Sequence, residues 1–265
     1  MYSNLFKELS IDCQKCSGLC CVALYYSKTD GFPEDKPANV PCKHLEPHFK
    51  CAIHSQLFEK NLKGCLIYEC FGAGQKVTQM YTGIGNWSTS PTLRKEIYEV
   101  FLTIRELHQM CWYLIQGLNM NTSSEVNKEI TLLIEENRQI AHQEPHKLLK
   151  YDLYDYRTRT NNILHLLTEK NAKSSSKSPK SFFGKNFRGK NLDGENFSMS
   201  YLIASNLEGC SLKGTNFLGA DMRDAIVKNT DLSKSLFLTQ MQINSTKGNS
   251  TTKLPFYLSP PASWI

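Results

Sequence analysis

The chain has 265 residues, of which 40% are apolar, with a net charge of +6 and ten cysteines. This length allows two or three domains, and no uncharged run reaches the roughly 18 residues needed to cross a membrane. The positive excess is spread thinly along the chain, without a compact basic patch, which argues against nucleic-acid binding.

The first 70 residues hold most of the cysteines of the chain. They are Cys13, Cys16, Cys20, Cys21, Cys42, Cys51, Cys65 and Cys70. A disulfide framework, a metal site and the packing of small apolar thiols would each explain such a cluster. The N-terminus has no basic start followed by an apolar run, so no signal peptide is evident. We therefore expect a cytoplasmic protein with reduced thiols.

Reduced thiols at this spacing are typical of metal chelation, because Cys13 and Cys16 form a Cys-x-x-Cys pair. His54 follows Cys51 by three residues and is a further candidate ligand. Soft thiolates favour zinc, iron or an iron–sulfur cluster over calcium or magnesium. We predict a metal site built from the eight cysteines and His54, and the spacing leaves open whether they form one site or two.

The same residues resemble a bacterial family of zinc- or iron-chelating domains, whose signature is Cys-x-x-Cys-x-x-Cys-Cys followed by Cys-x-x-Leu, Cys-x-Ile-Tyr and a last Cys. The matching positions are Cys13, Cys16, Cys20, Cys21, Cys42, Leu45, Cys51, Ile53 and Cys65. The chain departs from the signature by one extra residue before Cys20 and by His54 in the place of Tyr. The resemblance implies a metal-binding domain, which we assign to residues 1–88.

Helical periodicity follows over residues 89–169. Ser90 and Pro91 predict a helix start, and apolar residues recur about every 3.6 positions from Leu93 to Leu114. Thr122 and Glu125 predict a capping box for a second helix, and a third is expected over residues 151–169. We predict a small helical bundle. Its aromatic residues fit core packing better than a partner surface, and its scattered histidines receive no role.

A polar stretch rich in Ser and Lys, residues 170–181, predicts a flexible linker. Beyond it every fifth residue is apolar, a period that neither an α-helix nor a strand produces. These positions are Phe182, Phe187, Leu192, Phe197, Leu202, Leu207, Leu212, Phe217, Met222, Val227, Leu232 and Phe237. The expected structure is a square right-handed β-helix over residues 182–243, followed by a tail at 244–265.

Small residues usually lie two positions before each apolar residue, and Asn or Asp often lies one before it. The segment Gly219 to Asp224 is a close copy of the pattern A-[N/D]-[L/F]-x-x, and here the chain resembles the pentapeptide-repeat proteins. Some of these imitate duplex DNA. Three coils about 15 Å long with nearly balanced charge argue against that function here.

The combination of cysteine segment, helices and repeat is similar to a group of proteins from actinomycetes and bacilli. One of them is named for resistance to the nucleoside antibiotic oxetanocin A, which implies a resistance or self-protection role. The residues around Gly72 and Gly74 lack the ending of a phosphate-binding loop, and no catalytic base or nucleophile stands out.

We interpret the chain as a multi-domain α+β protein, a metal-stabilised and non-enzymatic binding or protective protein that docks on a protein partner. The unpaired strand edges at the ends of the β-helix need covering, by the tail or by a second copy in a homodimer. The alternative is a metal- or iron–sulfur-dependent redox enzyme or sensor that uses the N-terminal cysteines.

Overall fold

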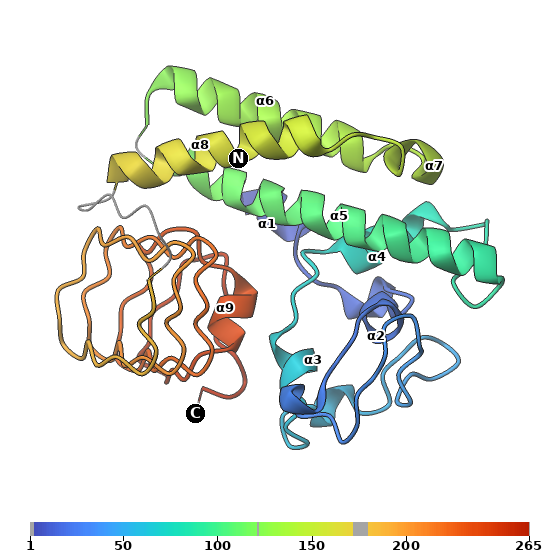
Figure 1. The fold of residues 1–265 in the computed structure, drawn as a ribbon, viewed down its shortest axis with the longest axis horizontal. Helices are drawn as coiled ribbons and strands as arrows, with labels where there is room; N and C mark the ends of the chain where they lie inside the picture. Colours follow the sequence, from blue (N-terminus) through green and yellow to red (C-terminus); the bar gives the residue numbers. More distant parts are fainter. Residues whose placement is uncertain (1–2, 121, 172–179, 265) are drawn as a thin grey trace. The chain divides into compact units, whose positions relative to one another are not determined.

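The fold was obtained as a computed structural model that describes residues 3–120, 122–171 and 180–264. The chain divides into two compact units, Met1–Ile163 and Leu164–Ile265, and the elements of each are labelled in Figure 1. Most of the predicted linker, residues 172–179, lies outside the described residues. None of the described helices combines the length and apolar character needed to cross a bilayer.

The N-terminal part of the first unit consists of short helices joined by irregular loops. They are α1 (Ser3–Glu8), η1 (Cys13–Lys15), α2 (Leu19–Ala23), η2 (Lys28–Asp30), η3 (His54–Gln56), α3 (Lys63–Ile67) and α4 (Ala73–Met80). Isolated antiparallel bridges join Tyr26 to Lys36 and Leu45 to Cys51. A small core of Tyr26, Phe32, Leu57 and Leu62 lies among these loops.

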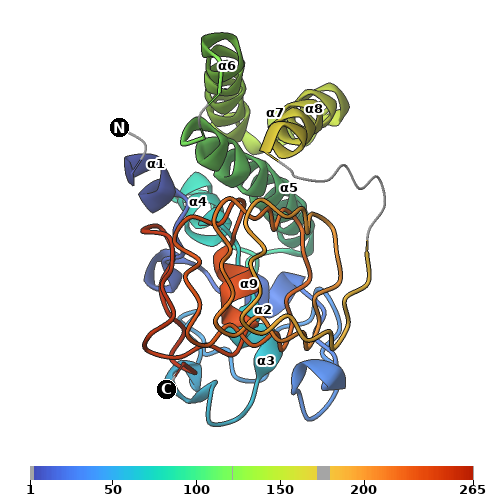
Figure 2. The same ribbon diagram turned by 90° about the vertical axis from the view of Figure 1, so that its left-hand side faces the viewer.

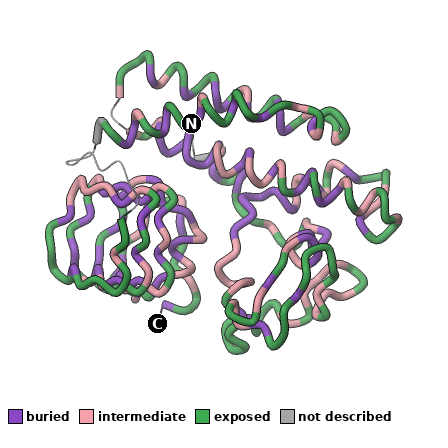
Figure 3. Tube along the Cα trace, in the orientation of Figure 1, coloured by how far each residue is buried: buried purple, intermediate pink, exposed green. Residues whose placement is uncertain are grey.

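The long helix α5 (Pro91–Leu118) is the centre of the first unit, packed against α1, α2, α4, α6 (Ser124–Ala141) and α7 (Pro145–Leu148). It begins as predicted, because the Ser90 side chain accepts the N–H of Leu93 and Pro91 occupies the first turn. The buried face of α5 runs along its length in Figure 3. Apolar residues of the predicted stripe, including Val100, Ile104 and Leu114, are fully buried.

Two helix starts differ from the sequence prediction by a few residues. The cap of α6 is Ser123, which accepts the N–H of Val126, whereas Thr122 donates to the side chain of Asn127. Ser123 has the β-region backbone that is typical of a cap, and Glu125 lies in the first turn. The third predicted helix is α8 (Tyr154–Asn171), which begins after Asp152, whose carboxylate accepts the N–H of Tyr154.

The second unit is a stack of coils in which residues 20 positions apart form parallel bridges, such as Ser181 with Tyr201 and Tyr201 with Asp221. Twenty residues are four pentapeptides, so each coil has four sides, and successive coils share a four-sided outline in Figure 2. From Phe187 to Phe237 every predicted inward side chain is buried, with at most 8% exposed. The bridges are isolated and do not join into continuous strands in the described residues.

Two side-chain patterns explain why this sequence coils. The Asn or Asp before each inward residue accepts the N–H two positions ahead, as Asn206 does from Glu208 at 3.0 Å. The small residue two before it reaches a carbonyl of the preceding coil, as Thr215 Oγ1 does with Leu192 O at 2.8 Å. Many polar groups at the corners are therefore satisfied locally or between coils, whereas the buried hydroxyl of Ser205 has no hydrogen-bond partner among the described residues.

The coils continue beyond the predicted boundary at residue 243. Lys247 forms a bridge with Ile226 and Lys253 with Asp231, and Trp264 Nε1 donates to the carbonyl of Thr246. The short helix α9 (Gln240–Asn244) interrupts the stack before this added turn, and the buried Gln242 side chain donates to two carbonyls of an earlier coil. The tail is thus part of the second unit's packed structure.

Candidate functional site

Four of the predicted metal ligands line one small cavity between the N-terminal loops and α4: Cys13, Cys16, Cys20 and Cys70. Gly74, in the first turn of α4, shows how closely two of the sulfurs approach it. A Cβ added there would lie 2.7 Å from Cys16 Sγ and 3.9 Å from Cys70 Sγ. These two thiols therefore converge on a position where only glycine fits.

The other four N-terminal cysteines, Cys21, Cys42, Cys51 and Cys65, form a second group. The N–H of Cys42 donates to the carbonyl of Cys21 at 2.9 Å. Burial, together with negative charge on Cys21, Cys42 and Cys51, raises the pKa of Cys65 to about 12. Burial also raises the pKa of Cys51, and again Cys21 and Cys42 add to it. The four thiols thus lie within electrostatic reach of one another.

Cys20 and Cys21 are adjacent and connect the two groups, because negative charge on Cys21 also raises the pKa of Cys13 and Cys16. The side chains of Cys20 and Cys21 form a hydrogen bond, which raises the pKa of Cys20 and lowers that of Cys21. A negative charge on either thiol therefore changes the pKa of thiols in both groups.

Backbone amides point at several of the sulfurs. Burial raises the pKa of Cys16, but the N–H groups of Leu19 and Gly18 lower it. The N–H groups of Gly74 and Gly72 act in the same way on Cys70, whose pKa burial raises to about 12. Such donors favour the thiolate, which is the form that binds metals.

Lys36 places a buried cation beside the thiols. The side chain is 7% exposed, and its Nζ donates to the carbonyls of Leu24 at 2.5 Å and Pro37 at 3.0 Å. Burial lowers the pKa of Lys36, whereas negative charge on Cys42 and Cys21 raises it. Ionised thiols nearby would add a counter-charge to the carbonyls that already accept from this ammonium.

The turn that carries Cys70 is held by groups far away in the sequence. Phe71 adopts a left-handed backbone conformation, with φ of 50°. Its N–H donates to the carboxylate of Glu69 at 2.8 Å, and its carbonyl accepts from His108 Nδ1 on α5 at 2.7 Å. Burial raises the pKa of Glu69 to about 7. Sequence reasoning missed His108 because 37 positions separate it from Phe71.

The remaining predicted ligand, His54, is exposed at the start of η3 and does not line the cavity of the first cysteine group. All ten cysteines are free thiols, and Cys111 and Cys210 are buried, as expected for packing residues. Within the described ranges, no set of three or more His, Cys, Asp or Glu side chains is close enough to hold a metal ion as placed.

A cleft of about 640 Å³ opens beside the first cysteine group. Cys16 lines both the cleft and the small cavity that holds the other thiols of its group. Lys50, also in the cleft wall, donates from Nζ to the carbonyl of Gln14 at 2.5 Å. The cleft therefore gives a small molecule a route to one thiol of this group.

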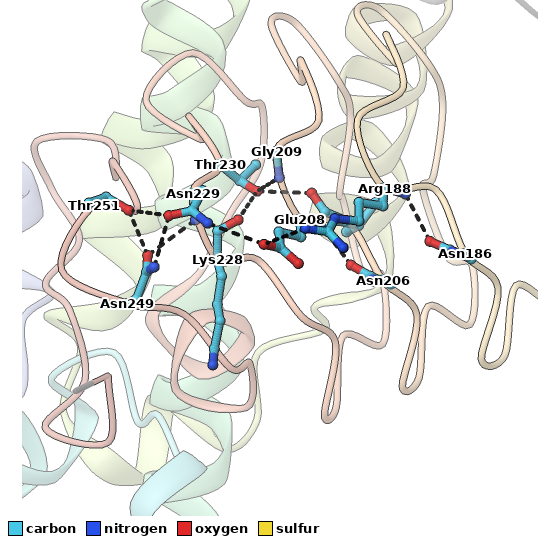
Figure 4. A network of polar contacts seen from close by, with 11 residues as sticks. Asn186, Arg188, Asn206, Glu208, Gly209, Lys228, Asn229, Thr230, Asn249 and Thr251 are labelled. Atoms are coloured by element: carbon cyan, nitrogen blue, oxygen red, sulfur yellow. Dashed lines mark hydrogen bonds and ion pairs between the residues drawn. The ribbon is translucent and has the colours of Figure 1, made fainter.

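On the outside of the second unit a polar ladder, Arg188, Glu208, Asn229 and Asn249, crosses successive coils (Figure 4). Arg188 and Glu208 are 3.5 Å apart, Asn229 Nδ2 donates to Glu208 at 3.2 Å, and Asn249 Nδ2 donates to Asn229 at 3.0 Å. Its members are about one coil apart in sequence, so the sequence reveals them only once the coil length is known.

Comparison with known proteins supports the interpretation of the second unit. The family model described as pentapeptide repeats matches residues 200–237 in eight copies, which implies a right-handed β-helix there. A protein of Bacillus subtilis (strain 168) named "Uncharacterized protein YybG" is 41% identical over 273 residues, covering 100% of this chain and 98% of that protein. Neither comparison bears on metal binding, redox activity or antibiotic resistance.

Proposed function

The chain belongs to the same family as YybG of Bacillus subtilis and contains pentapeptide repeats, and on that premise we propose that it is a non-enzymatic, metal-stabilised binding protein. Thiolate-bound zinc or iron folds its N-terminal segment, and its stacked coils offer a surface to a protein partner. The observation that carries the metal part of this proposal is the division of eight N-terminal cysteines into two groups of four.

Four thiolates are the complete ligand set of a structural zinc ion and of the common iron–sulfur clusters. The first group would use Cys13, Cys16, Cys20 and Cys70, and the second Cys21, Cys42, Cys51 and Cys65. When bound, the metal supplies positive charge that keeps these thiols ionised. The amide donors at Cys16 and Cys70 support the same ionised state.

Charge balance gives a second argument for the second group. A divalent ion held by four thiolates leaves a net charge of about −2, and Lys36 lies buried beside these thiols. Neutral thiols would leave its ammonium without a counter-charge, which is costly in a buried position. Lys36 therefore suits an ionised, metal-bound group better than four protonated thiols.

The need for a metal clip follows from the small core of this segment. Between α2 and α4 the buried apolar cluster has only Tyr26, Phe32, Leu57 and Leu62, with a few half-buried neighbours. Long loops held by so little apolar burial gain folding free energy from a bound metal. The metal is therefore proposed as a structural element, with no reaction required of it.

The metal proposal is tested by metal content and an absorption spectrum on untagged protein purified without oxygen. We expect two bound zinc ions, or two coloured clusters, per chain. Cys16→Ser should remove one and Cys65→Ser the other, whereas Cys210→Ser, on a buried cysteine of the repeat, should remove neither. Metal-free protein with freely titratable thiols would refute the proposal.

The docking part is carried by the polar ladder on the outside of the coils. Its partly exposed ion pair and amides are hydrogen-bonded across coils, so they form a fixed array instead of independent mobile side chains. The variant Arg188→Glu should abolish partner capture or a protective phenotype without unfolding the coils. A protective or antibiotic-resistance role rests on the resemblance described above, and survival of cells carrying this variant would measure it.

A second candidate, a redox enzyme or sensor, is favoured by one observation. The cleft of about 640 Å³ gives access to Cys16, which a purely structural metal site does not need. Under this alternative Cys13, Cys16, Cys20 and Cys70 would hold an iron–sulfur cluster, which would supply electron transfer to a molecule in the cleft. A reversible change in the visible spectrum on reduction would favour it, and a colourless zinc protein would exclude it.

A further inference from the structure

A second cavity, of about 340 Å³, lies within the first unit between α1, α4, α5 and α6. Its volume is within the range of ~300–1,000 Å³ found for small-molecule sites. Its lining mixes apolar residues, such as Leu5 and Ala141, with polar and charged ones, among them Lys76, His108 and Asn137. A pocket in which several polar groups converge can fix the orientation of a ligand.

His108 gives this cavity a defined hydrogen-bond acceptor. The residue is 8% exposed, and burial lowers its pKa to about 4, so the imidazole is neutral at physiological pH. Its Nδ1 lies 2.7 Å from the carbonyl of Phe71, and because a carbonyl only accepts, Nδ1 carries the proton. Nε2 is therefore an acceptor, and because His108 lines the cavity, a ligand there can supply the donor.

The charged groups that line the cavity have a net positive balance. Lys76 and Arg138 are the cations, and Glu8 is the carboxylate. Arg138 lies 3.8 Å from Glu8 and 3.8 Å from Glu135, at the long end of ion-pair distances. One cation in excess of the lining carboxylates suits a ligand with a single negative charge.

We propose that this cavity binds a small organic monoanion that carries a hydroxyl or amino group opposite its carboxylate. The carboxylate contacts Lys76 and Arg138, and the hydroxyl or amino group donates to Nε2 of His108. This site is separate from the cysteine groups and does not depend on the metal proposal, so either can fail alone.

Three related compounds test both features: 4-hydroxybenzoate has the carboxylate and the donor, benzoate lacks the donor, and phenol lacks the carboxylate. Titration calorimetry measures affinity, and NMR of nitrogen-15-labelled histidine follows the His108 ring. We expect saturable binding of 4-hydroxybenzoate with a shift of His108 Nε2. Benzoate and phenol should bind at least about tenfold more weakly than 4-hydroxybenzoate, because each leaves a buried or charged group of the protein unsatisfied.

The matched variant is His108→Asn, because the Asn amide keeps an N–H donor for the Phe71 carbonyl and provides no equivalent of Nε2. Its affinity for 4-hydroxybenzoate should fall to that of benzoate. His146→Asn, on α7 and outside the cavity, is the control and should bind as the unaltered protein does.

Lys76→Gln separates the two contacts without touching the buried imidazole. This variant should weaken the binding of 4-hydroxybenzoate and benzoate alike and leave the binding of phenol unchanged. The proposal is overturned if 4-hydroxybenzoate produces no saturable shift of His108 in the unaltered protein, or if phenol binds it equally well. Unchanged affinity in a folded His108→Asn protein would also overturn it. Metal content measured on the same samples reports separately on the cysteine groups.

Discussion

The stacked coils and the cysteine-rich segment reach a folded state in opposite ways. In the coils every fifth residue repeats the same inward packing, and each corner is stabilised by contacts within five residues or one coil away. In the cysteine-rich segment, side chains from Cys13 to Cys70 converge from irregular loops around a small core. Regular local repetition makes the first region self-sufficient, whereas the second depends on a few long-range links.

Metal removal should have the largest effect and should separate the two regions. Structural zinc contributes on the order of 10 kcal/mol to the folding of small domains, so a strong chelator should unfold the cysteine-rich segment. The coils contain none of the proposed ligands and should stay folded. Hydrogen exchange with and without chelator measures both regions in one sample. Equal protection of residues 13–70 in the two conditions would contradict the comparison.

Truncation of an inward side chain should produce the reverse pattern. Phe217 is fully buried in the column, and Phe217→Ala should cost about 3–5 kcal/mol through lost burial and the cavity left behind. Chemical denaturation followed by hydrogen exchange should locate the loss in the coils. Met199→Ala, at an exposed position nearby, is the control with a small expected effect. A fall in metal content on Phe217→Ala would show that the regions are not independent.

Mild acid should destabilise the first unit more than the second, because six of the seven histidines, including His108, lie in the first unit. The pKa of His108 is about 4 in the folded protein and 6.5 when unperturbed. Its contribution to stability is therefore complete above pH 6.5 and is lost as the pH falls toward 4, by about 3 kcal/mol in total.

His108→Asn should flatten this dependence of the unfolding free energy on pH, and His146→Asn should not. Denaturation curves between pH 4 and 7 measure the slope for each protein. Identical slopes for His108→Asn and the unaltered protein would refute the assignment to His108.

The smallest effect tests the backbone of the coils. Ala204 has φ of 54°, in the left-handed region that costs a non-glycine residue about 1 kcal/mol. Ala204→Gly should therefore raise the stability of the second unit by up to about 1 kcal/mol. Ala225 is buried and does not have a positive φ, so Ala225→Gly should lower the stability of the second unit. Because Ala204 is exposed, destabilisation by Ala204→Gly would contradict the strain assigned to its backbone.

The five-residue period predicted the inward positions of the coils because packing there repeats with the sequence, as the burial of Leu207 and Leu232 illustrates. It did not predict that Lys247 and Lys253 extend the stack, because α9 shifts the spacing between coils by one or two residues. The start of α5 at Ser90 followed from local capping, whereas Thr122 and Ser123 are too similar for the sequence to rank as caps.

The candidate site was less accessible to sequence reasoning. The spacing identified the cysteines but did not assign them to groups, because Cys20 and Cys21 are neighbours in sequence and yet belong to different groups. The placement of Cys70 beside Cys16, of Lys36 beside Cys42 and of His108 beside Phe71 depends on tertiary packing. No local pattern encodes such pairs.

The most direct test of the central claim is native mass spectrometry of the intact chain together with its Cys16→Ser and Cys65→Ser variants. Two separate four-cysteine sites predict two bound ions or clusters in the unaltered protein and one in each variant. A chain without metal, or a single metal lost in both variants, would contradict the division of the eight cysteines into two sites.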